Sequence, residues 1–544
     1  MKSRGDSSAL GQTRTSEKRR GAQQKGGSVI RIGVDVGGTN TDAVVMEDDR
    51  VVASVKATTS PDVMIGVSQA LAGALEQSRI APQSVDVVAL GTTHFTNAVV
   101  QRRDLAPTAA IRLGLPATQA LPPMIDWPAD LRNAIGNHAY FAHGGHEFDG
   151  RAITPLDPDE LRKIAKDIVK KKIRTIAVSS VFSPVNTEVE RQAGDILTAA
   201  APGAHITLSS DIGRIGLLER ENAAIMNACL RDLSRVVMRA FRTALDGTGL
   251  SSRFFLTQND GTLMDAAYAE RFPVLTFASG PTNSMRGAAF LSGVLEGIVI
   301  DVGGTSTDVG SLHKGFPRQA PVAVEIGGVR TNFRMPDVFS IGLGGGSLVV
   351  EDGPNGKVTV GPQSVGYRLT TDALIFGGKT LTTSDIVVAA GRADFGDRTK
   401  VAHLSPGLIA RTRAKIMEMT HNAVERTRLS PEPLPVIVVG GGSVLIDPKI
   451  GDLDVMKPNH FACANAVGAA IAQVSGEVDR IYMLGKSTRE EALDDAKRKA
   501  TDAAVAAGAH RDSVTIVDVE DVPLAYIPGN ATRVRVKAVG ELAF

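Results

Sequence analysis

Cysteine is nearly missing from this chain. Its 544 residues include only Cys229 and Cys463. Two cysteines cannot form a disulfide framework or a thiolate metal cluster, and proteins without disulfides are typical of a reducing compartment. We therefore expect a cytoplasmic protein without a structural metal cluster of the zinc-finger kind.

An excess of charge of either sign is also missing. The sequence has 60 Lys and Arg residues against 59 Asp and Glu residues, a formal net charge of +1. Nucleic acids and membrane surfaces attract proteins through a surplus of positive charge. The composition therefore gives no reason to expect a nucleic-acid or membrane partner.

The first 28 residues lack an apolar segment. They are rich in Ser, Gly, Gln, Lys and Arg, which differs from the apolar core of a signal peptide or a membrane span. We expect a disordered tail there. The whole chain is 43% hydrophobic, which is enough for several cores, and its length suggests about three or four domains.

One twelve-residue pattern occurs twice. Residues 32–43 read IGVDVGGTNTDA and residues 298–309 read IVIDVGGTSTDV, with eight of the twelve aligned positions identical. Each copy lacks the third glycine and following helix of a Rossmann fingerprint, and the Gly-Lys-Ser/Thr of a P-loop. In both copies an apolar segment ends in Asp, passes a Gly-Gly pair and continues as a second apolar segment. This pattern predicts two β-hairpins with glycine tips.

A glycine tip of this kind suits phosphate binding. Backbone N–H groups can approach phosphate oxygens closely there, threonine hydroxyls add donors, and aspartate can hold a hydrated Mg²⁺. Two such hairpins predict two similar halves that enclose one nucleotide, with Asp35 and Asp301 at the metal. The predicted phosphate contacts are Gly37, Gly38, Thr39, Thr41, Gly303, Gly304, Thr305 and Thr307.

Two further glycine runs follow the second hairpin. Residues 340–347 read SIGLGGGS, and residues 436–443 read VIVVGGGS after a β-branched run. Glycines at the carboxyl end of a strand allow the backbone to lie flat against a base or a ribose. We predict this role for Gly440, Gly441, Gly442 and Ser443.

Helical and strand patterns alternate along the chain. Strands are expected near residues 85–90 and 175–181, with helices at 61–77 and 157–172, which predicts a layered α/β fold with parallel strands. Residues 218–245 are expected to form one long amphipathic helix between the halves. The predicted divisions are a tail (1–28), a first half (29–215), a second half (216–476) and a small α+β segment (477–544).

Polar loops at predicted strand ends are candidates for substrate binding. Gly91 to Asn97, GTTHFTN, follows a buried strand, although the same residues suit a well-capped helix start. Ser279 does not stand in a Gly-x-Ser-x-Gly elbow, so it is not interpreted as a hydrolase nucleophile. The candidate substrate residues are Thr92, Thr93, His94, Asn97, Asn259 and Ser279.

Residues 138–149 contain three histidines and two carboxylates. This density suggests a metal site, but the spacing fits no zinc-binding helix and the glycines place the residues in a loop or hairpin. The sequence leaves open whether the His138 to Asp149 cluster binds metal.

The motifs together resemble the hydantoinase A / 5-oxoprolinase family, in a short form. The segments DVGGTNTDAVV, GTTHFTNAV, VFSPVNTEVE, ERENAAIMNA, QNDGTLM, SGPTNS, DVGGTSTDV and GLGGGS occur in the family's order, over about residues 29–475. The hairpins and the late Gly-Gly-Gly-Ser resemble the phosphate and adenosine motifs of the actin-like ATPase superfamily, which includes acetate and sugar kinases, heat-shock chaperones and actin.

This resemblance implies an α/β fold with two ribonuclease-H-like, actin-type ATPase halves around a nucleotide cleft, followed by a small α+β appendage. It also implies that Mg·ATP is used to open a small cyclic amide or imide by phosphorylation of the amide oxygen. Asp35 and Asp301 would orient the metal's waters. Asp42 and Asp308 would act either as a general base or as partners of those waters, and the sequence leaves both roles open.

Other activities share the same nucleotide residues. The chain could be a small-molecule kinase or a subunit of an ATP-dependent carboxylase, or an ATPase switch that a protein partner stimulates. The resemblance also implies a homo- or hetero-oligomer, with a second hydantoinase-type subunit as a possible partner.

Overall fold

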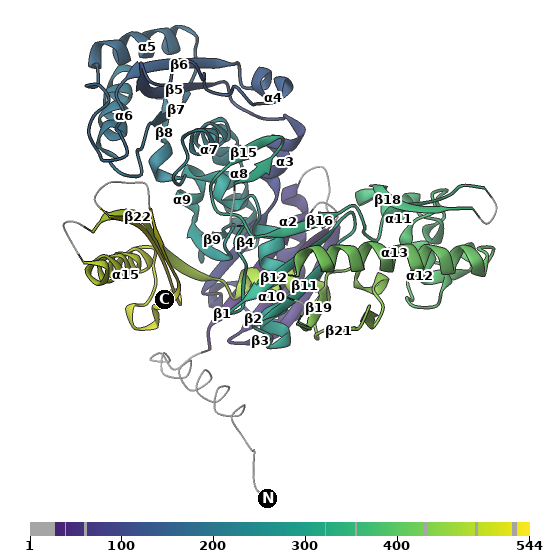
Figure 1. Ribbon diagram of the computed structural model, residues 1–544. Helices are drawn as coiled ribbons and strands as arrows, with labels where there is room; N and C mark the ends of the chain where they lie inside the picture. The colour runs from purple at the N-terminus through teal and green to yellow at the C-terminus, as the bar shows by residue number, and fades with distance from the viewer. Residues whose placement is uncertain are drawn as a thin grey trace, which may run out of the picture.

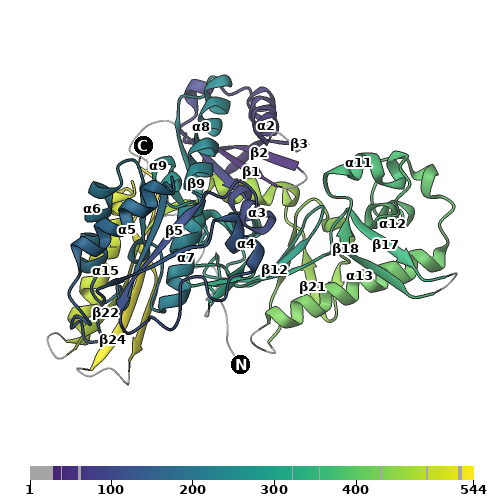
Figure 2. The ribbon, with the colours of Figure 1, turned by 90° about the horizontal axis from the view of Figure 1, so that it is seen from above.

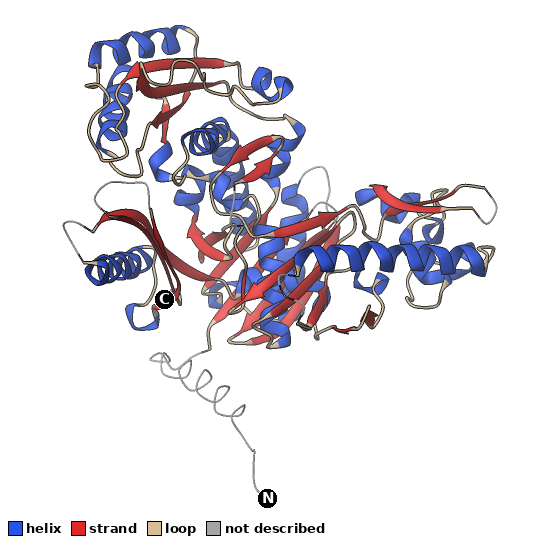
Figure 3. Cartoon of the chain, in the orientation of Figure 1, coloured by secondary structure: helices blue, strands red, loops and turns tan. Residues whose placement is uncertain are grey.

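The computed structural model describes residues 28–543, except for residues 38–39, 59–62, 321–322, 354–355, 429, 431, 485–487 and 525–529. Residues 1–27 of the predicted tail and the tip residues Gly38 and Thr39 therefore lie outside the described residues. The described chain is a mixed α/β structure in which helices cover the faces of several sheets (Figures 1 and 3). The predicted α/β class is confirmed.

The first sheet has nine strands, in the order β23-β24-β22-β10-β9-β4-β1-β2-β3. β1 and β2 form the first predicted hairpin, β3 completes an antiparallel meander, and β4 lies parallel to β1 on its other side. The strands are β1 Ile30–Val36, β2 Asn40–Glu47, β3 Arg50–Thr58, β4 Val87–Thr92, β9 Arg253–Thr257, β10 Thr262–Asp265, β22 Gln473–Met483, β23 Thr515–Pro523 and β24 Ala531–Gly540.

The second sheet repeats this local arrangement. β11 and β12 form the second predicted hairpin, and β19 lies parallel to β11 just as β4 lies parallel to β1. Its seven strands are β11 Gly297–Val302, β12 Thr307–His313, β13 Phe316–Pro317, β16 Val338–Ile341, β19 Val436–Val439, β20 Lys449–Ile450 and β21 Leu453–Met456.

A four-stranded inserted sheet lies between β4 and β9 in the sequence, at the top left of Figure 1. Its order is β6-β5-β7-β8 and every pairing is parallel. An aliphatic core that includes Ile111, Ile176 and Leu197 packs it against two helices. The elements are β5 Thr108–Leu115, α4 Ala129–Ala134, β6 His138–His143, α5 Pro158–Lys170, β7 Thr175–Ser180, α6 Glu188–Ala200 and β8 His205–Leu208.

The predicted long helix over residues 218–245 is wrong. The structure has two helices, α7 Leu217–Cys229 and α8 Arg231–Gly247. The Cys229 carbonyl accepts a hydrogen bond from the Ala106 N–H at 2.8 Å. This carbonyl is therefore satisfied from outside the helix at the point where α7 ends. α7 is buried from Arg220 onward, whereas α8 is amphipathic. The predicted single helix therefore combines two helices with different burial patterns.

Three other groups of elements complete the described chain. A short hairpin, β14 with β15, packs near α7 and α3, and a second hairpin, β17 with β18, projects to the right in Figure 2 together with α11 to α13. α15 covers the C-terminal strands. The bounds are α2 Val63–Ser78, α3 His94–Gln101, α9 Ala266–Arg271, β14 Val324–Ile326, β15 Val329–Thr331, β17 Ser347–Glu351, β18 Val358–Ser364, α11 Leu369–Asp372, α12 Thr383–Ala389, α13 Pro406–Thr427 and α15 Arg489–Ala506.

Two helices, α10 Ser279–Ser292 and α14 Ala464–Ala470, pack against each other between the two sheets. α10 buries Met285 and Ala288 against the second sheet, and α14 buries Ala466, Val467 and Ala470 against the first. Their close approach requires glycine on both sides. A Cβ atom at Gly287 would lie 1.9 Å from the Ala464 carbonyl oxygen, and one at Gly468 would lie 1.8 Å from that of Asn283.

The sheets do not end where the sequence suggested. β9 pairs with β4, and β10 pairs with β22, so the first sheet continues beyond the expected boundary at residue 215 and takes in the C-terminal segment 477–544. Motif order shows where a copy begins, but it carries no information on which sheet later strands join. Among the described residues, no helix has the length and apolar character needed to span a membrane.

Candidate functional site

The two hairpins place their aspartates in equivalent positions. Asp35 pairs with Asp42 across β1 and β2, and Asp301 pairs with Asp308 across β11 and β12. The structure therefore brings the four predicted catalytic aspartates into two matching pairs.

A glycine leaves room for each inner aspartate: Gly91 lies on the neighbouring parallel strand β4, and Gly440 directly follows the parallel strand β19. A Cβ atom at Gly91 would lie 2.6 Å from Asp35 Oδ1, and one at Gly440 would lie 2.3 Å from Asp301 Oδ1. Gly440 also has a φ of +87°, a conformation that L side chains rarely adopt. Any side chain at either position would displace a carboxylate.

Asn465 of α14 joins the two inner aspartates. Its Nδ2 lies 3.4 Å from Asp35 Oδ2 and 3.4 Å from Asp301 Oδ2. One amide nitrogen therefore reaches both carboxylates, which lie on different sheets. The predicted metal residues Asp35 and Asp301 are thus brought together, and their role as metal partners stays a prediction.

The two inner carboxylates resist ionisation. Burial, with repulsion from Asp42, raises the pKa of Asp35 to about 6. Burial, with repulsion from Asp308 and Asp35, raises the pKa of Asp301 to about 7. Asn465 opposes both increases by donating to the charged forms. Within the described residues neither carboxylate forms an ion pair with a basic side chain.

The two outer aspartates have different neighbours. Asp42 forms an ion pair of 2.5 Å with Lys56 on β3, whereas Asp308 accepts a hydrogen bond from Ser340. Burial raises the pKa of both carboxyls, and Lys56 or Ser340 opposes the change. This geometry fits a general base and a partner of metal-bound water equally, so both predicted roles remain open.

Backbone hydrogen bonds from the glycine run 340–347 hold the tip of the second hairpin. The carbonyls of Gly303 and Gly304 accept the N–H groups of Gly345 and Gly346 at 3.0 and 2.7 Å. Within the described chain, the N–H groups of Gly304 and Thr305 have no acceptor. The glycine run 340–347 therefore acts as a platform that holds the tip and leaves its donors available, as phosphate binding requires.

Two of the predicted threonines are buried, and the first N–H group of each tip is already bonded. Thr41 and Thr307 are fully buried, and the Thr307 hydroxyl donates to the Leu343 carbonyl at 2.6 Å, so its predicted phosphate contact would require another arrangement. The N–H of Gly37 donates to the Asn40 carbonyl across the first tip at 3.0 Å, and the N–H of Gly303 donates to the Ser306 carbonyl across the second tip at 2.9 Å. The predicted contacts of Gly38 and Thr39 lie outside the described residues.

The late glycine run lies against the second hairpin. Gly442 donates its N–H to the Val302 carbonyl at 2.8 Å, and Gly440 donates to that of Phe461 at 2.9 Å. A Cβ atom at Gly441 would meet no atom within 4 Å, whereas Ser443 is fully buried. The run is thus adjacent to the predicted phosphate tip, and its contact with a base or ribose stays a prediction.

The predicted substrate residues divide into two groups. Ser279 and Asn259 are buried and bond to the backbone, because Ser279 Oγ donates to the Thr92 carbonyl at 3.0 Å and Asn259 Oδ1 accepts the Ala278 N–H at 2.7 Å. Thr93, His94 and Asn97 begin α3, where the pKa of His94 is lowered by burial. The position of this segment agrees with both sequence interpretations, a helix start and a ligand-binding loop.

The His138 to Asp149 cluster does not converge. His143 bonds to Glu160, and His146 lies 3.2 Å from Asn186. Across the described residues, no three His, Cys, Asp or Glu side chains are grouped to hold a metal ion. The metal hypothesis for this cluster therefore has no support in the structure.

Sequence reasoning missed three residues of the site: Asn283, Ser284 and Asn465. Asn283 and Ser284, on α10, lie beside Asp35 and Asp301 and oppose the rise in their pKa values. None belongs to a hairpin motif. The available signal was the small residues around them, which allow α10 and α14 to approach closely enough to place all three between the sheets.

Two family models match the chain in order. The hydantoinase/oxoprolinase N-terminal region matches residues 31–201, and the hydantoinase/oxoprolinase model matches residues 220–397. Curated relatives include the acetophenone carboxylase gamma subunit of Aromatoleum aromaticum, 27% identical over 67% of this chain and 53% of the relative. Another is the caprolactamase subunit alpha of Pseudomonas jessenii, 24% identical over 81% of this chain and 65% of the relative.

Two solved structures share the fold. The ATP-dependent caprolactamase from Pseudomonas jessenii has a TM-score of 0.73 at 18% identity, covering 94% of this chain and 88% of that one. A nucleotide-free acetone carboxylase has a TM-score of 0.69 at 18% identity, covering 95% and 88%. The chain spans between 53% and 65% of the lengths of the curated relatives it matches. On the two consecutive family models, this chain belongs to the hydantoinase/oxoprolinase family.

Proposed function

We propose that this chain is an ATP-dependent enzyme that opens a small cyclic amide or imide by phosphorylating its amide oxygen. The observation that carries the proposal is the meeting of Asp35 and Asp301 at Asn465, from two hairpins of nearly identical sequence. Among the described residues, these two carboxylates, one buried and one partly buried, have raised pKa values and no ion pair with a basic side chain, so they form a site of unbalanced negative charge. Such a site favours a bound cation.

The residues fit Mg²⁺ accompanied by a nucleotide. The inner aspartates supply oxygen ligands, or partners for metal-bound waters, and Mg²⁺ usually keeps several waters and shares phosphate oxygens. When bound, Mg²⁺ would neutralise charge on the phosphates. The N–H groups of Gly304 and Thr305 would hold phosphate oxygens, with Gly440, Gly441 and Gly442 next to the nucleoside. In this proposal the two sheets form the two actin-like halves around the nucleotide.

Phosphorylation addresses the weak reactivity of an amide. Transfer of the γ-phosphoryl group from ATP to the amide oxygen, with release of ADP, makes the amide carbon open to attack by water. The ring C–N bond of the resulting adduct then breaks as the nitrogen takes a proton, and the acyl phosphate that remains is hydrolysed to a carboxylate and phosphate. Positioning of the two reactants and electrostatic stabilisation are the main contributions that a protein makes to such a transfer. Asp42 or Asp308, if unprotonated, would accept the proton of the attacking water.

Similarity to the caprolactamase supports the lactam reaction, because its name states ATP-dependent action on a lactam. A second candidate, an ATP-dependent carboxylase subunit, is favoured by similarity to the acetophenone and acetone carboxylase subunits. Both groups of relatives are named as subunits, and this chain spans only part of their length. We therefore propose that a second subunit of the same family type completes the enzyme.

The test is phosphate release from the purified chain with Mg·ATP and a panel of 5-oxoproline, hydantoin, succinimide and simple lactams, each with and without bicarbonate. Ring-opened product formed in equal amount to phosphate would support the proposal. A requirement for bicarbonate with a ketone substrate would favour the carboxylase instead. ATP binding without stimulation by any of these compounds, even after a co-purified partner is added, would contradict both.

A further inference from the structure

A cavity of about 190 Å³ lies at the edge of the inserted sheet, and none of the residues that line it belongs to either hairpin. One wall is the loop that follows β7, and the opposite wall is the turn that leads into α7. Six of its eight lining residues have apolar side chains. They are Val181, Phe182, Pro184, Val185, Ile215 and Leu217, with Gly216 and Arg220 completing the lining.

The position of the cavity is one that parallel sheets use for ligands. In the order β6-β5-β7-β8 the chain passes to one side of β5 and then to the other, so the carboxyl ends of β5 and β7 form a topological switch point. Open α/β sheets bind ligands in the crevice outside such a point. The loop after β7, which begins at Val181, supplies half of the lining.

The same loop contains a strained residue. Phe182 has a φ of 52°, which is an uncommon conformation for a bulky L residue. Strain of this kind costs roughly 1–3 kcal/mol and is found preferentially at functional sites. The VFSPVN segment is also one of the motifs that the nucleotide site does not use.

The only charged lining residue offers no free charge to a ligand. Arg220 is 1% exposed, and its guanidinium donates to Ser209 Oγ at 3.0 Å and to three backbone carbonyls. These belong to Arg214 at 3.0 Å, Gly216 at 3.3 Å and Ser180 at 2.6 Å. The guanidinium is therefore occupied, and a carboxylate in the cavity would find no partner.

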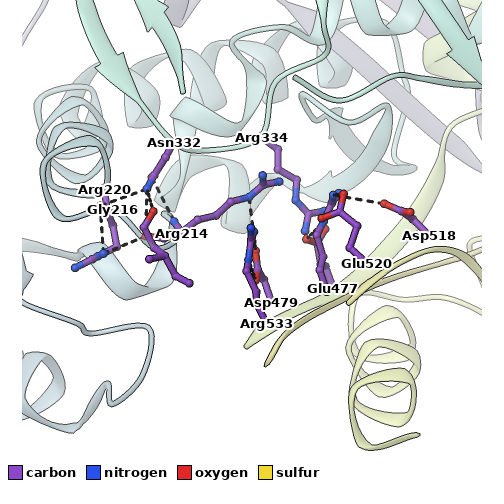
Figure 4. A network of polar contacts seen from close by, with 12 residues as sticks. Arg214, Gly216, Arg220, Asn332, Arg334, Glu477, Asp479, Asp518, Glu520 and Arg533 are labelled. Carbon is purple, nitrogen blue, oxygen red and sulfur yellow. Dashed lines mark hydrogen bonds and ion pairs between the residues drawn. The ribbon is translucent and has the colours of Figure 1, made fainter. Parts of the chain in front are cut away.

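The second wall is held in place from another part of the chain. Asn332, just after β15, donates to the carbonyls of Arg214 and Ile215 at 3.1 and 3.0 Å and accepts the Arg214 N–H at 3.3 Å. Arg214 in turn lies 3.7 Å from Asp479 on β22. Figure 4 shows Asn332, Arg214, Gly216 and Arg220 converging on this turn. Side chains from distant parts of the sequence therefore hold this wall of the cavity in place.

We propose that this cavity binds a small uncharged molecule with an aliphatic ring or short alkyl chain. Apolar cavities of about 150 Å³ hold benzene, so this one has room for a six- or seven-membered ring. Two sources share this chemistry: the ring of the enzyme's own substrate, which rests on the proposed function, and a separate effector. In both cases a neutral lactam is preferred over an acid such as 5-oxoproline.

Calorimetric titration of the full chain with ε-caprolactam, without ATP, tests the binding. Val185→Trp fills the cavity and should weaken binding at least tenfold, whereas Val236→Trp, at a 60% exposed position on α8, should leave it unchanged. 5-oxoproline should not compete. Absence of binding to the native chain, or equal binding to both variants, would overturn the proposal.

A second pair of variants covers the possibility that Val185→Trp does not fold. Ile215→Asp places a charge at the rim, where Ile215 is 37% exposed, and Ile65→Asp on α2, where Ile65 is 48% exposed, is the matched control. Only the first should lose caprolactam binding. If both retain it, the cavity is not the site.

ATPase measurements separate the two sources. A substrate ring predicts that Val185→Trp raises the KM for caprolactam in the stimulated reaction and leaves basal ATP hydrolysis unchanged. An effector predicts that caprolactam alters ATP hydrolysis without being opened. If no lactam is opened and yet binding depends on Val185, the proposed reaction fails and the binding site stands.

Discussion

The two hairpins have nearly the same sequence and different surroundings. In the first, Lys56 forms an ion pair with the outer aspartate, Asp42. In the second, the outer aspartate accepts a hydrogen bond from Ser340 and has no ion pair among the described residues, and the tip is held by the backbone of residues 345–346. The pKa of Asp35 is raised to about 6 and that of Asp301 to about 7.

The same motif therefore gives two pairs of carboxylates that the protein neutralises to different extents. The first hairpin carries its own positive group and is partly neutralised within the protein. The second has no such group among the described residues and retains a stronger demand for an external cation. We therefore expect Asp301 to contribute more to metal-dependent activity than Asp35, although their backbone positions match.

Removing the charge at Asp301 should have the largest effect. We expect Asp301→Asn to lower the kcat of Mg·ATP hydrolysis roughly 10³-fold, because pre-organised charge around a transferring phosphoryl group has effects of this size. Asp35→Asn should cost roughly tenfold less. Tm without metal should rise for Asp301→Asn at pH 8, since the variant removes repulsion with Asp35 and Asp308. A fall in both kcat and Tm would show a fold defect instead.

Alanine substitutions at Gly440 and Gly91 should distinguish a clash with fixed backbone from a clash with side chains that can move. In Gly440→Ala the new Cβ would lie 2.5 Å from the Val302 carbonyl oxygen at a φ of +87°, and we expect a loss of about 3 kcal/mol in the free energy of unfolding. In Gly91→Ala it would meet the ends of the Asn283 and Asp35 side chains, which can move, so the expected loss is about 1 kcal/mol. Urea unfolding measures both, and equal losses would contradict this distinction.

Stability should depend on pH in a direction set by the inner aspartates. Their pKa values in the folded protein, about 6 and about 7, exceed the ordinary value, so the folded state binds more protons than the unfolded state. Stability without metal should therefore fall as pH rises from about 4 to 7. Mg·ADP should raise Tm more at pH 8 than at pH 5, because the cation favours the ionised carboxylates. Asp301→Asn should flatten both trends.

Lys56→Met should have the smallest effect and make the first hairpin more like the second. Lys56 lowers the pKa of Asp42 and Asp35, so its loss should move the acid limb of the activity profile to higher pH by less than about one unit. Its side chain is 41% exposed, and we therefore expect a stability loss of no more than about 1 kcal/mol. Arg50→Met, at an exposed pair on the same strand, is the control.

Local patterns were sufficient to predict the two hairpins and the strand near residues 175–181, which is β7, but not the inserted sheet as a separate unit. The Asp35 and Asp301 segments are β-branched runs closed by glycine, so the strands and their turns depend on neighbouring residues alone. The same reasoning gave the correct family. It did not separate α7 from α8, because the break at Leu230 follows from a hydrogen bond to Ala106, which lies on another part of the chain.

The contacts between the inner aspartates could not be predicted in this way. Asn283 and Asn465 reach the site only because Gly287 and Gly468 let α10 and α14 pack closely. That packing depends on the two sheets on either side, and the small residues of the two helices permit it without specifying it. The extension of the first sheet by the C-terminal strands is equally non-local, since β10 and β22 meet over two residue pairs.

The place of α14 in the chain has a consequence for biosynthesis. It covers Val44 and Met46 of β2, yet it is made only after the whole second sheet. At about 5–20 residues per second, the ribosome needs roughly 20–80 s to proceed from Glu47 to Ala464. During that time Val44 and Met46 lack the cover of α14. We expect the nascent chain to depend on a chaperone that holds this part of β2, and ribosome-bound chains that stop before Ala464 to be captured by it.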